Sequence, residues 1–102
     1  MQRLPDPIKR FFAPEATAAC FADDAVVVDE KETHRGRPAI AAWSADAIAK
    51  YHHTTVPLSV ESHGTETVVT ARVTGTFPGS PVELRYRFTV AGDLITRLEV
   101  TP

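Results

Sequence analysis

Hydrophobic and polar residues follow a helical spacing in the first half of the chain and a strand spacing in the second. The first half carries two apolar sets at intervals of three and four: Ile8, Phe11 and Phe12, and then Ile40, Trp43, Ala47 and Ile48. Such intervals are typical of a helix that covers a core with one side. We predict a short helix near residues 8–12 and a longer one from 37 or 38 to about 51, with each apolar set facing the core.

The segment between these helices carries the other signals of the first half. Residues 15–21 continue the helical pattern after Pro14, which suits a first helical turn. Phe21 ends that pattern, and an apolar run that closes on Asp29 then predicts a strand over 26–29. A polar turn at 30–32 leads to a second short strand over 33–35. The sequence therefore predicts three N-terminal helices and one strand pair.

Period-two alternation begins at Thr54 and continues to the end of the chain. It covers residues 54–62, 67–77, 82–91 and 94–101, with turn residues between these segments. The clearest segment has one apolar face, made of Val82, Leu84, Tyr86, Phe88 and Val90, and one charged face. In the last segment we expect Leu94, Leu98 and Val100 to point inward and Ile95 outward. Helices followed by a meander predict an α+β fold, in which a curved sheet wraps around the helices and leaves room for a pocket.

Composition narrows the choice of function classes. The 102 residues make one domain, with 43% hydrophobic and 24% charged residues and no apolar run long enough to span a bilayer. The first ten residues do not resemble a signal peptide, so we expect a cytoplasmic protein with no membrane partner. A net charge of −2 with dispersed arginines argues against nucleic-acid binding. Cys20 is the single cysteine and cannot form an internal disulfide; we expect a buried thiol.

Asp29 is the first candidate for chemistry. If its side chain points inward among Val27 and Trp43, loss of water would raise its pKa and make it suitable as a general base. The competing interpretation is a solvated carboxylate at a strand end, or one paired with Arg35. Strand register decides between these interpretations, because the base hypothesis fails if Val28 points inward and Asp29 points to solvent.

Three further residues could act beside Asp29. His34 lies across the predicted turn and could form an Asp–His pair, or be a strand histidine covered by the long helix. Tyr86 could orient a ligand with its hydroxyl, and Trp43 could line a pocket, although packing in the core explains both. His52 and His53 are adjacent and point to opposite faces of an extended segment, so they do not form a metal site. The sequence predicts neither a metal nor a cofactor.

The run FADDAVVVDE…THRGRPAIAAW over residues 21–43, together with the order of elements, resembles the SnoaL-like branch of the nuclear transport factor 2-like superfamily. The resemblance covers nearly the whole chain. It implies a cone-shaped α+β barrel with a curved antiparallel or mixed sheet, an apolar pocket, and a homodimer formed through the outer sheet face. The superfamily contains isomerases, cyclases, dehydratases, hydrolases and proteins that only bind, so it indicates fold more than function.

The ketosteroid isomerases of this superfamily allow a comparison at single positions. Their catalytic base follows the same Phe-Ala-Asp-Asp-Ala segment and falls on Asp29. Their two oxyanion donors fall on Phe11 and Leu84, which cannot donate a hydrogen bond. Loss of one such donor typically lowers the rate about 10²- to 10³-fold. The resemblance therefore disfavours steroid isomerisation.

The expected function is binding of a small apolar metabolite in an apolar pocket. Within that pocket, Asp29 would be the base of a cofactor-independent isomerase, cyclase or hydrolase, assisted by His34. The residues expected to contact the ligand are Phe11, Phe12, Trp43, Leu84 and Tyr86. The alternative is a non-catalytic binding or dimerisation module with the same fold.

Overall fold

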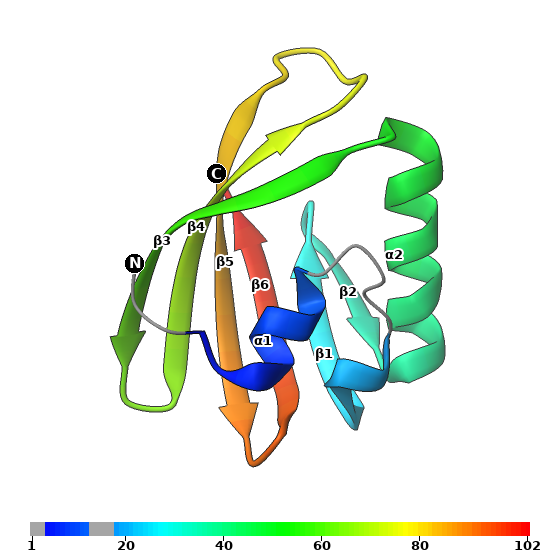
Figure 1. Cartoon of the computed structure of the whole chain (residues 1–102). Coiled ribbons are helices and arrows are strands. Elements are labelled where there is room, and N and C mark those ends of the chain that lie inside the picture. Colours follow the sequence, from blue (N-terminus) through cyan, green and yellow to red (C-terminus); the bar gives the residue numbers. More distant parts are fainter. Residues whose placement is uncertain (1–3, 13–17) are drawn as a thin grey trace.

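A computed structural model describes residues 4–12 and 18–102 (Figure 1). In chain order its elements are α1 (Asp6–Phe11), the 3₁₀ turn η1 (Ala18–Cys20), β1 (Phe21–Asp29), β2 (Glu32–Arg35), α2 (Arg37–Tyr51), β3 (Thr54–His63), β4 (Glu66–Thr74), β5 (Val82–Ala91) and β6 (Leu94–Thr101). The strands form one sheet in the order β2-β1-β6-β5-β4-β3. All neighbours are antiparallel except β1 and β6, which are parallel, so the sheet is mixed.

The predicted meander is confirmed. Strands β3 to β6 pair in sequence, and β5 and β6 have the predicted bounds. Strand β4 ends at Thr74, three residues earlier than predicted, and residues 75–81 form the connecting loop. The side chain of Phe77 in this loop packs against the core. The predicted α+β class is therefore correct. The loop between β4 and β5 is longer than the alternation alone indicated.

One face of the sheet carries the core; we call it the inner face. Tyr86 pairs with Val69, and Phe88 pairs with Leu98, which itself pairs with Val27 on β1. All five side chains are buried. Burial of a large apolar side chain contributes about 1.5–3 kcal/mol. These buried cross-strand pairs therefore hold the meander and β1 together as one layer.

The prediction for the start of β6 was wrong. Ile95 is fully buried at 0% exposure, although simple alternation placed it on the outer face. The pairing shifts because Thr89 lies opposite Arg97 while Val90 lies opposite Ile95, which leaves Thr96 as an extra residue. The Thr96 hydroxyl donates to the Thr89 carbonyl at 3.2 Å. A β-bulge of this kind reverses the face on which later side chains point.

The three N-terminal helices and the cone-shaped barrel are not confirmed. Helix α1 is present, and α2 has the predicted start and end. The predicted helix over 15–21 falls partly on residues 13–17, outside the described residues; its last part is the 3₁₀ turn η1, and Phe21 opens β1. In α2, Ile40 is buried as predicted, but Ile48 is 54% exposed. The apolar spacing of α2 therefore continues past the part of the helix that is buried.

The segment that most resembles the family forms a latch between β1 and α2. The Arg37 Nε donates to the Phe21 carbonyl at 2.8 Å, and Arg37 Nη1 lies 2.8 Å from Asp23 Oδ1. The Gly36 N–H donates to the Ala25 carbonyl at 2.8 Å, with a φ of +84° that favours glycine. These contacts fix where α2 starts relative to β1, so this part of the motif has a structural role.

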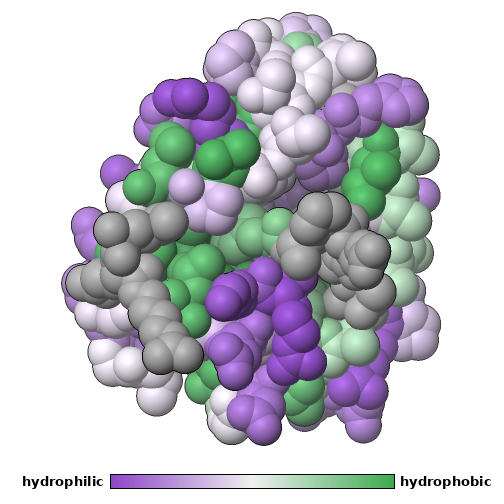
Figure 2. All heavy atoms as spheres, viewed as in Figure 1, coloured by the Kyte–Doolittle hydropathy of each residue, from purple (hydrophilic) through white to green (hydrophobic). Residues whose placement is uncertain are grey.

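Figure 2 shows, on the face that carries α1, several patches of apolar side chains with charged and polar side chains between them. Buried Ile8 of α1 belongs to the same core as Phe21 and Phe88. Among the described residues, no helix is long and apolar enough to cross a membrane.

Candidate functional site

Asp29 is the last residue of β1 and lies on the inner face. Its neighbour two residues back, Val27, is fully buried, and strand alternation places both side chains on the same side. A two-residue turn follows, in which Glu30 and Lys31 have φ values of 51° and 66°. The register condition set by the sequence is therefore met: Val27 and Asp29 point inward.

Trp43 holds the Asp29 carboxylate from α2. Its Nε1–H donates to Asp29 Oδ2 at 2.9 Å. The latch at Gly36 and Arg37 sets the position of α2, and Trp43 follows about two turns later on the side that faces the sheet. The two partners lie 14 residues apart in sequence, and both are half-buried.

Burial raises the pKa of the Asp29 carboxyl above its ordinary value. The hydrogen bond from Trp43 opposes this shift, the nearby negative charge of Glu30 adds to it, and His34 acts in the lowering direction. Partial loss of water therefore has the largest effect, because a carboxylate is more stable in water than in an apolar setting. A carboxylate with a raised pKa is a better proton acceptor.

His34 lies near Asp29, but the two do not form the pair that the sequence suggested. On the β1–β2 ladder His34 is opposite Val27, and Glu32 is opposite Asp29. His34 Nε2 is 4.0 Å from Glu32 Oε2, and the imidazole lies 6.1 Å from the Trp43 ring. The hydrogen bonds of the carboxylate come from Trp43 and from the backbone of Glu30 instead. His34 therefore lies close enough to lower the pKa of Asp29 without being its hydrogen-bond partner.

Tyr86 brings a hydroxyl to the inner face from β5. The side chain is buried, and its pKa is raised to about 12 by burial, while a hydrogen bond with Thr55 opposes the shift. The negative charge of Asp29 also raises the pKa of Tyr86, so the two groups are electrostatically coupled. Thr55 was not predicted from the sequence, because one threonine within a β-rich segment carries no distinct signal.

Aromatic rings from α1 cover this part of the sheet. The Phe11 ring lies 6.5 Å from Trp43 in a stacked arrangement and 6.0 Å from Tyr86. The Phe12 ring contacts Tyr86 edge to face at 5.4 Å. Leu84 packs against the same core two residues before Tyr86. The expected ligand-contacting residues therefore share one face, and we call Asp29, Trp43, Tyr86, Phe11 and Phe12 the inner-face site.

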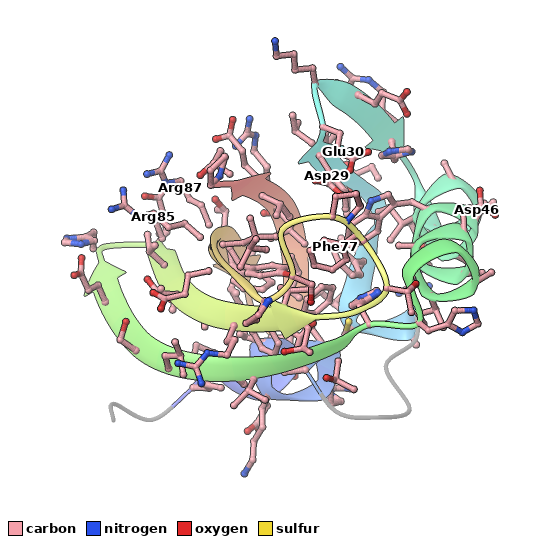
Figure 3. All side chains as sticks on the ribbon, turned by 90° about the horizontal axis from the view of Figure 1, so that it is seen from above. Asp29, Glu30, Asp46, Phe77, Arg85 and Arg87 are labelled. Carbon is pink, nitrogen blue, oxygen red and sulfur yellow. The ribbon has the colours of Figure 1, made fainter. Side chains whose placement is uncertain are left out.

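Two hollows of the structure lie away from Asp29. One, of about 450 Å³, is lined by Arg72, Pro81, Val82 and Glu83. The other, of about 260 Å³, is lined by polar residues that include Glu61, Arg85 and Arg87. Figure 3 shows Arg85 and Arg87 on the side of the sheet opposite Asp29 and Phe77. The second hollow therefore belongs to the outer face.

The inner-face site brings one carboxylate together with polar and aromatic side chains. Asp29 is its carboxylate, Trp43 and Tyr86 are hydrogen-bond donors, and Phe11 and Phe12 supply apolar surface. Within residues 4–12 and 18–102, no group of three histidine, cysteine, aspartate or glutamate side chains could hold a metal ion.

A family model described as the SnoaL-like domain matches residues 9–98. None of the curated proteins compared with the chain matches it. Among solved structures, a candidate polyketide cyclase from Sinorhizobium meliloti is 38% identical, with a TM-score of 0.91. The alignment covers 96% of this chain and 95% of that one.

Two more distant structures share the fold. A hypothetical protein from Catenulispora acidiphila with a ketosteroid isomerase-like fold, solved in complex with trimethylamine, is 21% identical with a TM-score of 0.84, covering 98% of this chain and 87% of that one. A candidate SnoaL-like polyketide cyclase from Jannaschia is 19% identical with a TM-score of 0.75, covering 98% and 89%. At these identities the likeness concerns the fold alone.

Proposed function

The chain belongs to the SnoaL-like domain family, and from this premise we propose that its inner-face site binds a small apolar metabolite and uses Asp29 as a general base. One observation carries the proposal: Asp29 is half-buried, its pKa is raised, and Trp43 holds it at 2.9 Å. A solvated carboxylate at a strand end would not combine these properties. The reaction class is cofactor-independent proton transfer.

The proposed step moves one proton from the substrate to Asp29. A C–H bond next to a carbonyl breaks, an O–H bond forms on the carboxylate, and the electron pair passes to the carbonyl oxygen as an enolate. Return of the proton to another carbon yields an isomer. Trp43 keeps the carboxylate in place, and Tyr86 is the hydroxyl donor that supports the enolate. Phe11 and Leu84 cannot donate, which keeps steroid isomerisation disfavoured.

A non-catalytic binding module is the second candidate, and the packing of the rings favours it. Phe11 stacks on Trp43 and also contacts Tyr86, which Phe12 meets edge to face. Rings that touch one another leave less room for a substrate. In a module, the same side chains would form an apolar contact surface and Asp29 would fix the orientation of a bound group.

Exchange of carbon-bound hydrogen tests the proposed catalysis. The purified chain is incubated in D₂O with 2-tetralone, a cyclic ketone with acidic C–H bonds, and deuterium uptake is followed by NMR. We expect wild-type protein to accelerate uptake and Asp29→Asn to lower the rate about 10²- to 10⁴-fold, toward the buffer rate. Asp24→Asn, which removes an exposed carboxylate from the same strand, is the control and should retain the wild-type rate.

The two candidates give different results in this experiment. Binding of 2-tetralone without accelerated exchange supports the module and rejects the base. The indole N–H signal of Trp43 reports binding, because Trp43 is the one tryptophan of the chain. Equal acceleration by wild type and Asp29→Asn would also reject the base, since exchange would then come from another group.

A further inference from the structure

Asp29 forms no ion pair with a lysine or arginine among the described residues. None of the ion pairs in this part of the chain includes Asp29. The charged groups that shift its pKa are Glu30, which raises it, and His34, which lowers it. A lysine or arginine near a carboxylate would hold the pKa low, whereas that of Asp29 is raised.

The arginines that form ion pairs are engaged elsewhere. Arg37 pairs with Asp23 in the latch, and Arg87 and Arg97 pair with Glu99 on the outer face. On α1, Arg10 donates to the Asp93 carbonyl. The inner-face site therefore holds a half-buried carboxylate that no lysine or arginine of the described residues pairs with.

The aromatic rings of the inner-face site add partial negative charge to that of Asp29. The face of an aromatic ring carries partial negative charge and attracts cations. Trp43 donates its N–H edge to Asp29, and its ring stacks with Phe11 at 6.5 Å. Phe11, Phe12 and Trp43 are only partly buried, so part of each ring is accessible. A carboxylate beside accessible aromatic rings is complementary to an organic cation.

We propose that the inner-face site selects ligands in which an apolar skeleton carries a small organic cation, an alkylammonium group, over neutral and anionic ligands of the same shape. The inference rests on the proposed function only in placing the ligand at this site, and it requires no catalysis. Asp29 supplies the charge, while Trp43 and Phe11 supply ring surface. An anion would be repelled by Asp29, and a neutral group would leave this charge unpaired.

Choline and its neutral carbon isostere 3,3-dimethylbutan-1-ol provide the test, because they differ in charge and hardly in shape. Each compound is titrated into the full chain at about pH 8, where an ordinary carboxyl group is ionised. The indole N–H signal of Trp43 in an NMR spectrum reports binding beside Asp29. We expect choline to bind at least about tenfold more tightly than the isostere.

Three variants separate the site from general charge effects. Asp29→Asn keeps the shape of the side chain and should reduce the preference for choline to about twofold or less. Phe11→Leu keeps an apolar side chain but removes a ring face, and it should weaken choline about two- to fivefold while changing the isostere less. Asp24→Asn, the control with the same loss of charge at an exposed position, should keep the wild-type preference.

Equal or tighter binding of the isostere to wild-type protein would overturn the inference and leave the proposed function standing. The same holds if the preference for choline survives Asp29→Asn. Failure of both compounds to shift the indole signal also overturns it. The proposed function fails separately, if 2-tetralone shows neither binding nor Asp29-dependent exchange.

Discussion

At the scale of single residues, the position of Asp29 has a cost in stability that depends on pH. Its pKa in the folded chain lies above the ordinary value of 3.8, so ionisation is less favourable in the folded chain than in the unfolded one. This destabilising effect is absent where the carboxyl is protonated in both states. It grows as the pH rises from 3.8 through the folded pKa, and it is fully present above the folded pKa.

Replacing Asp29 with asparagine should therefore stabilise the chain at pH 7, with a smaller gain as the pH falls. The amide oxygen of asparagine can still accept from Trp43, while the buried charge is gone. Urea unfolding at several pH values measures the effect, with Asp24→Asn as the exposed control. A variant less stable than wild type at pH 7 would show that the charged form of Asp29 supports the fold.

Trp43 should act on both the charge and the stability of the site. In Trp43→Phe the ring remains largely apolar, but Asp29 loses the donor that opposes its raised pKa. We expect a further rise in the pKa of Asp29, followed by ¹³C NMR of the carboxyl group. We also expect a loss of about 1–2 kcal/mol in the free energy of unfolding, because a hydrogen bond to a charged group is lost. An unchanged Asp29 pKa would show that the bond has no electrostatic effect.

At the scale of elements, the β1–β2 hairpin has a turn that its sequence does not favour. Glu30 and Lys31 both have positive φ, a conformation that two-residue hairpins usually assign to Asn-Gly. Residues with a Cβ pay about 1–2 kcal/mol each for left-handed backbone. The pairing of Asp29 with Glu32 and of Val27 with His34 holds the turn in place.

The double variant Glu30→Asn and Lys31→Gly should stabilise the chain by about 1 kcal/mol, because both new residues tolerate positive φ. Thermal unfolding measures this gain. Lys31→Ala is the control, since it removes the same charge but keeps a Cβ, and it should give no such gain. Loss of stability in the double variant would mean that the Glu30 and Lys31 side chains contribute more than the strain of the turn costs.

The latch between β1 and α2 explains why the family motif indicates the fold better than the function. Gly36 and Arg37 hold the carbonyls of Ala25 and Phe21, and Arg37 also pairs with Asp23. These residues bring the end of β1 and the first turns of α2 together. Asp29 meets Trp43 as a consequence.

At the scale of the whole molecule, the outer face of the sheet carries a row of paired charges. Arg87 lies 3.3 Å from Glu66 and 3.6 Å from Glu99, and Arg97 lies 3.7 Å from Glu99. Partly exposed pairs of this kind contribute little to the stability of one chain, about 0–1 kcal/mol each. Their alternation of sign allows two copies of the face to complement each other, as the resemblance to the family led us to expect.

We therefore expect a homodimer in sedimentation at micromolar concentration. Arg87→Glu should shift the homodimer to monomer, because the new carboxylate would lie beside those of Glu66 and Glu99 and the three would repel one another. The control is Lys9→Glu, which reverses an exposed charge on α1. A wild-type chain that sediments as a monomer at tens of micromolar contradicts the expected dimer.

Much of the fold followed from local patterns. Alternation predicted β5 and β6 with their bounds, and helical spacing predicted α2. The face of Ile95 was wrong because a bulge is a property of two paired strands, which one strand's alternation does not contain. The exposure of Ile48 was missed for a related reason. How many turns of α2 the sheet covers depends on the sheet, and the apolar spacing of the helix does not contain it.

For the site, the sequence by itself determined the chemical groups, a carboxylate at Asp29 and a hydroxyl at Tyr86 on the apolar face of an alternating strand, and left open the face on which Asp29 lies. Only the tertiary structure decided their partners. In the folded chain, Trp43 and not His34 donates a hydrogen bond to Asp29. Tyr86 forms a hydrogen bond with Thr55, and the Phe11 ring stacks on Trp43. The physical reason is that alternation fixes the direction of a side chain, whereas hydrogen bonds and burial depend on residues that distant segments bring within a few ångströms.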